Sequence, residues 1–461
     1  MTALDLIRSG TAEACRPWPR FSLTMESWSA MIAALAQDPG ASLLGLWADT
    51  QQVHALLGDG AGALVASVAV EGGGYPALSP VRPVASRLER MIRDLWGHAA
   101  TGGDARAWLD HGRWPMAQPL SPRPGLPGGA VEPPQFPAVE DPGVTQVPLG
   151  PVHGLIEEPA HLRLVTHGDT VLRSEARLGY AHKGILALMR GKSPRAAARF
   201  VARLAAEATV AHSVAFARAA EAAVDTPAPP RAAALRVAML EQEHVAGHLD
   251  DLARAADAAG MAPLHAALGE QREVLLRAAE RAFGHRLMMD VVVPGGLAAD
   301  IAADGVTALR EAADAVAVAL TPVRRRLGLL LGRLDGLGRI TFAQGALGCV
   351  AGDAAARYEA RAAEAAAGLD RLRAALEELP DGPVSATLPA ESGEGLNGAN
   401  SQRGTVWHWL RLDHGQIAAC FPCDPGWLLW PVAETAMAGE SVEDAQMIRL
   451  SFGLPCAALD L

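Results

Sequence analysis

The residues with the most obvious metal or redox chemistry are Cys420 and Cys423, which form the only Cys-x-x-Cys pair in the chain. Two thiols at this spacing can supply half of a tetrahedral zinc site, or can open and close as a redox-active disulfide. Cys456 with His408 or His414 would be the further zinc ligands, but their spacing matches no zinc-finger pattern. The third interpretation is a pair of packed, unreactive thiols, and this is the one that we expect for Cys420 and Cys423.

A second group of candidate ligands lies in "EQEHVAGH", where Glu241, His244 and His248 follow at i, i+3 and i+7 along one side of a predicted helix. Glu-x-x-His is half of the motif that binds two metals in carboxylate-bridged bundles. The sequence shows no second copy on a facing helix, so buried or solvated polar side chains are the expected role. "VPGG" (293–296) lacks both phosphate-loop signatures and predicts a structural turn.

Composition limits the partners of this protein. The 461-residue chain has a formal net charge of −11 and a pI near 5.7, which argues against a nucleic-acid partner. Its five cysteines suggest no disulfide framework, so a reducing compartment is expected. No signal peptide is recognisable, and no stretch approaches the roughly 20 apolar residues of a membrane span. We expect no transmembrane segment in this chain, which can still dock on a membrane protein.

Hydrophobic periodicity and the placement of proline and glycine predict an α+β protein with two domains. Residues 1–115 indicate a small α/β domain, in which two helices accompany strands expected over 42–50 and 62–70. Residues 116–147 are dense in Pro and Gly, and predict a linker or an extended strap. For residues 148–461 we expect a large, mostly helical bundle with small flanking sheets.

Helix and strand signals place the individual elements. Two strands are expected around the turn His167-Gly168-Asp169, and strands return after 402. Ser193-Pro194 is a good cap and first-turn pair for a helix that runs to about 224. The other helices of the chain are expected at 28–37, 84–97, and about 231–259, 263–283, 300–332 and 353–379. Asp353 is the expected cap of the last of them.

Residues 150–190 carry the resemblance to a known family. "GPVHGLIEEPAHLRLVTHGDTVLRSEARLGYAHKGI" closely resembles the opening of the large subunit of group 4, energy-converting nickel–iron hydrogenases and of the related D subunit of complex I. "EQEHVAGHL", "GHRLMMDVVVPGGLAAD" and "SQRG" are similar to later segments of that family. "YPALSPVRPVASRLERMIRDLWG" resembles the complex I C subunit. The resemblance implies a C-like domain fused to a D-like domain, the layout of formate-hydrogenlyase-type large subunits.

The sequence departs from the family where the hydrogenases bind nickel and iron through two Cys-x-x-Cys pairs. The first pair falls on Ala205 and Ala208, and in the second Cys456 remains while its partner is Leu459. Alanine and leucine have no lone pairs to offer a metal. The resemblance therefore implies a divergent member without a nickel–iron site or hydrogenase activity of its own, and Cys456 as the only retained ligand position.

Ionisable side chains would remain in the former active-site cavity, where they could relay protons or bind a quinone-like molecule. The family's quinone-binding Tyr position falls on Ala206. Lys183 stands where complex I has an Arg near its partner's iron–sulfur cluster, so the resemblance implies a cation that can tune such a cluster; a solvated surface lysine is the alternative. In the structural alternative the cavity residues pair with one another, for example Glu207 with Arg203. The cavity candidates are His153, Glu158, His161, Arg203, Glu207, His212 and Arg403.

The resemblance implies a subunit of a membrane-associated oxidoreductase complex, similar to NADH:quinone oxidoreductase or hydrogenase, that serves electron transfer or proton coupling. We expect no bound cofactor in this chain, with a quinone as the one candidate ligand. An iron–sulfur small subunit and antiporter-like membrane subunits are the expected partners. The expected location is cytoplasmic, at the inner face of the cell membrane. The alternative is a non-catalytic scaffold or assembly protein that docks the iron–sulfur subunit.

Overall fold

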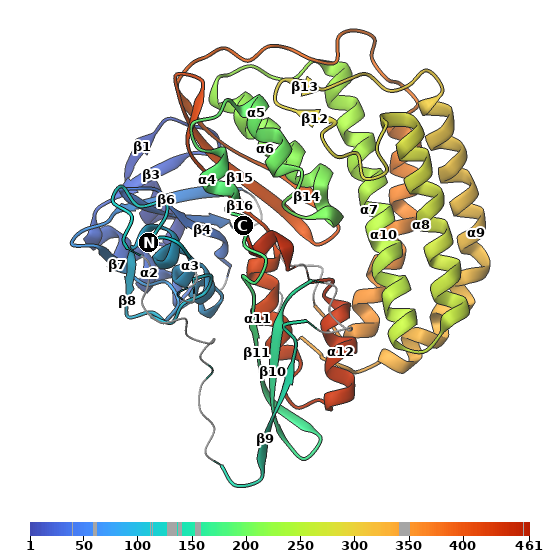
Figure 1. Ribbon diagram of the computed structural model, residues 1–461, viewed down its shortest axis with the longest axis horizontal. Helices are drawn as coiled ribbons and strands as arrows, with labels where there is room; N and C mark the ends of the chain where they lie inside the picture. The colour runs from blue at the N-terminus through green and yellow to red at the C-terminus, as the bar shows by residue number, and fades with distance from the viewer. Residues whose placement is uncertain are drawn as a thin grey trace.

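A bundle of long helices stands beside several small sheets in the computed structural model (Figure 1). The structure describes residues 1–461 except 39, 59–61, 111, 113, 127–135, 137–140, 153–157, 341–350 and 455. Helices account for 44% of the chain and strands for 23%, so the expected α+β class is confirmed. One connected core includes Trp47 near the N-terminus and Trp427 near the C-terminus. The domain limits at 115 and 147 stay a prediction.

The N-terminal part contains a five-stranded sheet with the order β1-β3-β6-β5-β4. The strand expected over 42–50 is β4, and the one over 62–70 is β6. The strands are β1 (Thr11–Glu13), β3 (Arg20–Leu23), β4 (Ser42–Ala48), β5 (Gln52–Gly58) and β6 (Ala63–Ala69). Helices α1 (Ala3–Arg8), α2 (Met25–Leu35) and α3 (Ser86–Trp96) accompany it, followed at Gly97 by a left-handed turn with φ of 82°.

Three smaller sheets lie between residues 74 and 297 of the described chain. The expected strand pair around residues 167–169 is present and is joined by a third strand, giving β11-β10-β9. The strands are β9 (Val144–Leu149), β10 (His161–His167) and β11 (Thr170–Arg177), and the two-stranded sheets are β7 (Gly74–Pro76) with β8 (Ala99–Thr101) and β12 (Val292–Val293) with β13 (Gly296–Leu297).

The helical bundle consists of α7 (Pro230–Ala258), α8 (Ala262–Phe283), α9 (Gly305–Leu334) and α10 (Ala354–Ala375), with α9 on its outer side (Figure 1). The four helices match the expected ones to within a few residues at each end. Asp353 caps α10 as expected, because its carboxylate accepts a hydrogen bond of 2.9 Å from the Ala356 amide.

The single helix expected from 193 to 224 is wrong, because two helices lie there. After α4 (Ile185–Met189), α5 (Pro194–Val201) ends and α6 (Thr209–Ala223) starts at about 120° to it. The intervening residues include an extended Ala205 and the 3-10 turn η2 (Ala206–Ala208). A tertiary contact explains the break: Glu243 of α7 accepts hydrogen bonds from the first free amides of α6.

After residue 402 the C-terminal part returns as strands, as expected, but the strand that precedes them and the two helices that follow them are not predicted by the sequence. The sheet order is β16-β15-β14-β2, so a strand from the start of the chain forms its edge. The strands of this sheet are β2 (Cys15–Pro17), β14 (Gly393–Ser401), β15 (Gly404–Asp413) and β16 (Gln416–Cys423). They are followed by α11 (Gly426–Ala436), α12 (Val442–Ser451) and the 3-10 turn η4 (Ala457–Leu459). Another 3-10 turn, η1 (Pro83–Ala85), directly precedes α3 in the N-terminal part.

Helix α6 lies directly on this C-terminal sheet. A Cβ atom at Gly395 of β14 would stand 2.0 Å from the Ala219 carbonyl oxygen of α6, so only glycine permits this approach. The close packing fixes the start of α6 relative to the β14–β15 hairpin, whose turn carries Gln402 and Arg403. Within the described ranges no single helix is long and apolar enough to cross a membrane; only the bent α5–α6 pair passes that test, by length and composition.

Candidate functional site

Three segments that are distant in the sequence meet at the break between α5 and α6. They are the stretch that precedes β10, residues 206–207 of the break, and the turn of the β14–β15 hairpin. Together with α7 and α8 they enclose a cleft of about 200 Å³. Its lining consists of Glu158, Ala206, Glu207, Gln242, Glu243, Ala246, Gly247, Asp250, Asp251, Arg254, Arg272, Leu276, Arg286, Leu287, Met288, Gln402 and Arg403. Three of the seven predicted cavity residues, Glu158, Glu207 and Arg403, therefore share one space.

Glu158 holds the C-terminal loop of the chain through its carboxylate. One oxygen accepts hydrogen bonds from the amides of Cys456, at 2.8 Å, and Ala457, at 2.5 Å. Burial raises the pKa of Glu158, and the nearby Glu207 carboxylate raises it further, while the two amides act in the opposite direction. A carboxyl group with a raised pKa can exist in both protonation states closer to neutral pH than an exposed one.

Glu207 lies across from this contact and pairs with Arg403. The Arg403 Nη1 atom is 3.2 Å from the Glu207 carboxylate, and Arg403 also donates to the Gly453 carbonyl. The neighbouring Gln402 amide donates to the Glu207 carbonyl at 2.9 Å. Arg403 is buried, with 8% of its surface exposed, so a bound carboxylate compensates the cost of burying its charge.

Arg203 does not enter the cleft, and the pairing of Glu207 with Arg203 is wrong. The Arg203 guanidinium makes two hydrogen bonds, of 2.6 and 2.7 Å, to the carboxylate of Asp290, and both side chains are about half exposed. The physical reason is the break after α5: Arg203 follows the end of that helix on the outside, whereas Glu207 sits one turn later on the inside.

Of the three histidine candidates, the two that the structure describes do not line the cleft. His161, on β10, lies beside the ring of Phe136 at a centroid distance of 5.0 Å. His212, on α6, is fully buried and stands between His408, at 3.0 Å, and Asp424, at 3.2 Å. His153 lies outside the described residues.

Lys183 holds two of the converging segments together. Its Nζ atom donates to the Leu204 carbonyl at 2.8 Å, beside the helix break, and to the Ala457 carbonyl at 3.0 Å, in the C-terminal loop. Burial lowers the pKa of Lys183, although the attraction of Asp460 and Glu158 opposes that change. This position fits a role in fixing the loop, and leaves its predicted role near a partner's cluster as a prediction.

Two carboxyl groups that the sequence analysis missed belong to the same environment. Glu243 lies in "EQEHVAGH", but between the residues that its spacing singled out, and burial raises its pKa to about 7. Asp460, next to the C-terminus, accepts from the amides of Gly179, at 2.6 Å, and Ala181, at 3.1 Å, and burial raises its pKa to about 6. Neither carries a sequence signal, because each is defined by contacts with distant backbone.

The members of "EQEHVAGH" that looked like ligands have other partners. Glu241 pairs with Arg371 at 2.9 Å, and the Nε2 atom of His244 bonds the Asn400 carbonyl at 2.6 Å. His248 is largely buried, and burial holds its pKa well below the usual value. Within the described residues no group of three or more Cys, His, Asp or Glu side chains is arranged to hold a metal ion.

The cysteine pair lies on strand β16, and its spacing matters there. Side chains three residues apart on a strand point to opposite faces, so Cys420 and Cys423 are badly placed to share a metal ion. Both thiols are buried, and burial raises the pKa of Cys420 to about 12 and that of Cys423 further. Protonated, buried thiols are poor ligands and poor nucleophiles.

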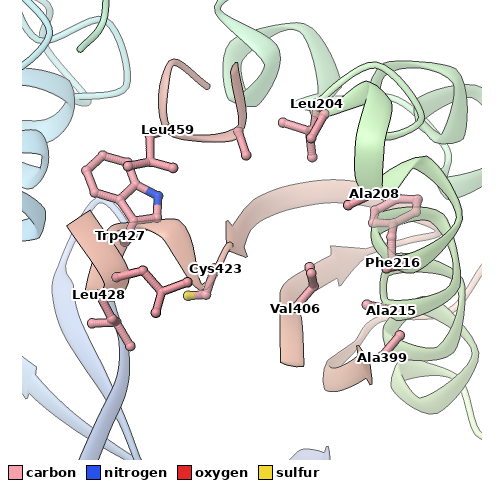
Figure 2. Close-up of a cluster of buried hydrophobic side chains, with 14 of the residues drawn as sticks. Leu204, Ala208, Ala215, Phe216, Ala399, Val406, Cys423, Trp427, Leu428 and Leu459 are labelled. Atoms are coloured by element: carbon pink, nitrogen blue, oxygen red, sulfur yellow. The ribbon is translucent and has the colours of Figure 1, made fainter. Parts of the chain in front are cut away.

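The residues that stand at the family's metal positions do not fit a nickel–iron centre. Figure 2 shows Ala208 and Leu459 among apolar side chains that include Leu204, Cys423 and Trp427. Leu459, which the resemblance aligns with a family thiolate, is fully buried. Burial and the Glu158 carboxylate raise the pKa of the remaining Cys456. One protonated thiol beside alanine and leucine is not a donor set for these metals.

The protein combines a long helical bundle and small sheets with a carboxylate-rich cleft, which lies where the C-terminal loop meets the stretch before β10. The chain is a divergent relative of the group 4 membrane-bound hydrogenase and complex I-like subunits. It is 25% identical to formate hydrogenlyase subunit 5 of Escherichia coli over 81% of this chain and 74% of that one. It is 24% identical to the carbon monoxide-induced hydrogenase of Rhodospirillum rubrum, over 67% and 97%.

Two further comparisons bear on the family and the fold. Hydrogenase-4 component G of Escherichia coli is 25% identical over 81% of this chain and 73% of its own length. A chain of the membrane-bound sulfane sulfur reductase, an archaeal respiratory membrane complex, superposes with a TM-score of 0.64 at 18% identity, over 71% of this chain and 100% of that chain. The latter likeness shows the fold. No family model matches the sequence.

Proposed function

We propose that this chain is a subunit of a membrane-bound respiratory complex of the hydrogenase and complex I type, and that it couples redox chemistry to proton movement. The relatives are named as a formate hydrogenlyase subunit, a carbon monoxide-induced hydrogenase and a hydrogenase-4 component, and they match most of this chain. In such an assembly it would lie on the cytoplasmic side, against membrane subunits and an iron–sulfur small subunit. The observation that carries the proton role is the Glu158 carboxylate seated on the loop that corresponds to the hydrogenase metal loop.

The C-terminal loop that carries Cys456 also supports the proposal that the chain has no hydrogenase activity. A nickel–iron centre needs four thiolates, and only Cys456 occupies a matching position. The Glu158 carboxylate bonds the backbone of that loop, and Leu459 is packed into an apolar cluster.

Proton transfer would use the carboxyl groups around the cleft. Glu243 and Asp460 have pKa values of about 7 and 6, and that of Glu158 is raised. Groups with such values release and rebind protons at low cost near neutral pH. Lys183, between Glu158 and Asp460, would stabilise the ionised forms. The direction of net transfer would be set by the redox state of the partner's cluster.

A quinone in the cleft is the second proposal. Leu276, Leu287 and Met288 offer an apolar wall, and Arg403 offers hydrogen-bond donors to a carbonyl. The cleft measures about 200 Å³, and most of the residues that line it are polar or charged. The geometry thus favours protons and water over a whole quinone ring. The alternative of a non-catalytic scaffold differs from both proposals, because docking of an iron–sulfur subunit requires no protonation change at Glu158.

The test is Glu158→Gln in the assembled complex. The glutamine oxygen can still accept the loop's amide hydrogen bonds, but the side chain cannot take up a proton. We expect proton translocation in proteoliposomes to fall by about a hundredfold, the usual size of one acid–base step, with the subunit composition unchanged. Glu270→Gln, on the exposed side of α8, is the matched control.

Two results would overturn this proposal. Full proton translocation by the Glu158→Gln complex would remove the proton role and leave the scaffold alternative. Stoichiometric nickel in the anaerobically purified chain, together with hydrogen-dependent dye reduction, would contradict the absence of hydrogenase chemistry.

A further inference from the structure

A second space, separate from the cleft, lies between the helices of the bundle. It measures about 230 Å³ and is lined by residues 317–327 of α9 and 362–373 of α10, with contributions from α7 and α8. Ten or eleven residues of helix span roughly 15 Å, so this volume is drawn out into a narrow slot. A slot of that shape fits a linear chain better than a ring system.

The floor of the slot is apolar, and its walls are made of small side chains. Leu249, Leu252 and Leu369 at the floor are each at most 2% exposed. Ala317 of α9 and Ala366 of α10 line the walls, and an alanine leaves space that a leucine would fill. Burial of a linear apolar ligand against such a floor is favourable in proportion to the area that it removes from water.

The mouth of the slot carries a cation without a carboxylate partner. Arg324 lines it and is exposed, as are Arg325 and Arg326. Over the described residues, no ion pair is formed by any of the three. On the opposite wall, Arg373 is already paired, with Asp314 at 2.7 Å and Asp370 at 2.6 Å. The free positive charge is therefore on the α9 side.

The charge of this region is opposite to that of the chain. Residues 315–339 contain five arginines and one aspartate, whereas the whole chain has a net charge of −11. Close to the slot, Pro322 lacks an amide hydrogen, so the Val318 carbonyl loses its α-helical donor. Val318 is 75% exposed. Helix α9 is thus weakest, and its surface partly apolar, where the slot opens.

We propose that this slot binds an anionic amphiphile: a linear acyl chain lies along the leucine floor, and its carboxylate or phosphate pairs with Arg324. Charge complementarity selects an anionic headgroup, and the narrow volume selects a single chain. A free fatty acid and a membrane phospholipid both present this chemistry, and the experiment below distinguishes the two sources. The inference is independent of the proton role of the cleft.

Binding of myristate to the purified full-length chain, measured by equilibrium titration, tests the slot. We expect saturable binding at one site. Ala366→Leu fills the wall and is expected to weaken binding about tenfold or more, whereas Ala363→Leu, on the exposed side of α10, leaves it unchanged. Circular dichroism verifies the fold of both variants, and Ala317→Leu repeats the filling from α9.

The headgroup contact has its own variants. Arg324→Gln is expected to weaken myristate binding about tenfold and to leave binding of uncharged tetradecanol unchanged, while Arg325→Gln, with the same loss of charge, affects neither. Flotation with phosphatidylglycerol vesicles, against phosphatidylcholine vesicles, identifies a phospholipid source if only the former bind. Absence of binding to both myristate and phosphatidylglycerol, or unchanged binding by the filled variants, overturns the proposal.

Discussion

Replacing Glu243 by glutamine tests the electrostatics of the cleft most directly. Glu243 is 9% exposed and accepts hydrogen bonds of 2.6 and 2.9 Å from the amides of Val210 and Ala211 at the start of α6. Burial raises its pKa from 4.5 to about 7, against the effect of these two hydrogen bonds. Glutamine has nearly the same shape and can still accept a hydrogen bond, but it does not titrate.

The raised pKa of Glu243 makes folding depend on pH in a defined direction. Between pH 4.5 and 7 the folded protein retains a proton that the unfolded chain releases, so stability declines as the pH rises through this window. The full change is about 3.4 kcal/mol for a difference of about 2.5 pKa units. Between pH 5.5 and pH 8 the part that remains to be lost is about 2 kcal/mol.

Urea unfolding of the isolated chain at pH 5.5 and pH 8 measures this change. We expect the stability of the wild type, relative to Glu243→Gln, to be about 2 kcal/mol lower at pH 8 than at pH 5.5. The exposed Glu270→Gln variant should follow the wild type at both pH values. An unchanged difference between wild type and Glu243→Gln, or a change of opposite sign, would refute the reasoning.

Four further substitutions address the remaining structure. Glu394→Ala strips Arg20 of a buried partner that it contacts at 2.6 and 2.8 Å, so urea unfolding should show a loss of about 3–5 kcal/mol, and a loss below 1 kcal/mol would contradict the pairing. Leu459→Ala should cost about 2–5 kcal/mol in the same assay because it empties buried space; a neutral effect would show that Leu459 is not packed as described. Cys420→Ala and Cys423→Ala should have effects that add to within about 0.5 kcal/mol, whereas strong coupling or a loss of bound zinc would indicate a shared site.

Local sequence signals were sufficient for most of the long elements. Ser193 and Asp353 cap the helices that they were expected to start, because a side-chain oxygen and the amide three residues later need only local geometry. The bundle helices and the strands around residues 167–169 follow from periodicity in the same way. Their ends shift by a few residues, since the final turns depend on packing.

The missing parts all depend on contacts between distant segments. Residues 202–208 are mostly good helix formers, so nothing local predicts the break; Glu243 stabilises it from another helix. Helices α11 and α12 were missed because the preceding strands set the expectation for the tail. The partner of Glu207 is Arg403 and not Arg203, since the chain turns between positions 203 and 207.

The carboxyl groups of the site share one construction. Glu158, Glu243 and Asp460 each accept hydrogen bonds from two backbone amides, and such bonds favour the ionised form. The pKa of each is nevertheless raised, so the cost of burial exceeds the gain from the amides. The amides fix where each carboxyl group sits, and burial places its proton affinity nearer to neutral pH. The position and the proton affinity of each carboxyl group are thus set by separate features, as the proposed proton transfer between fixed groups requires.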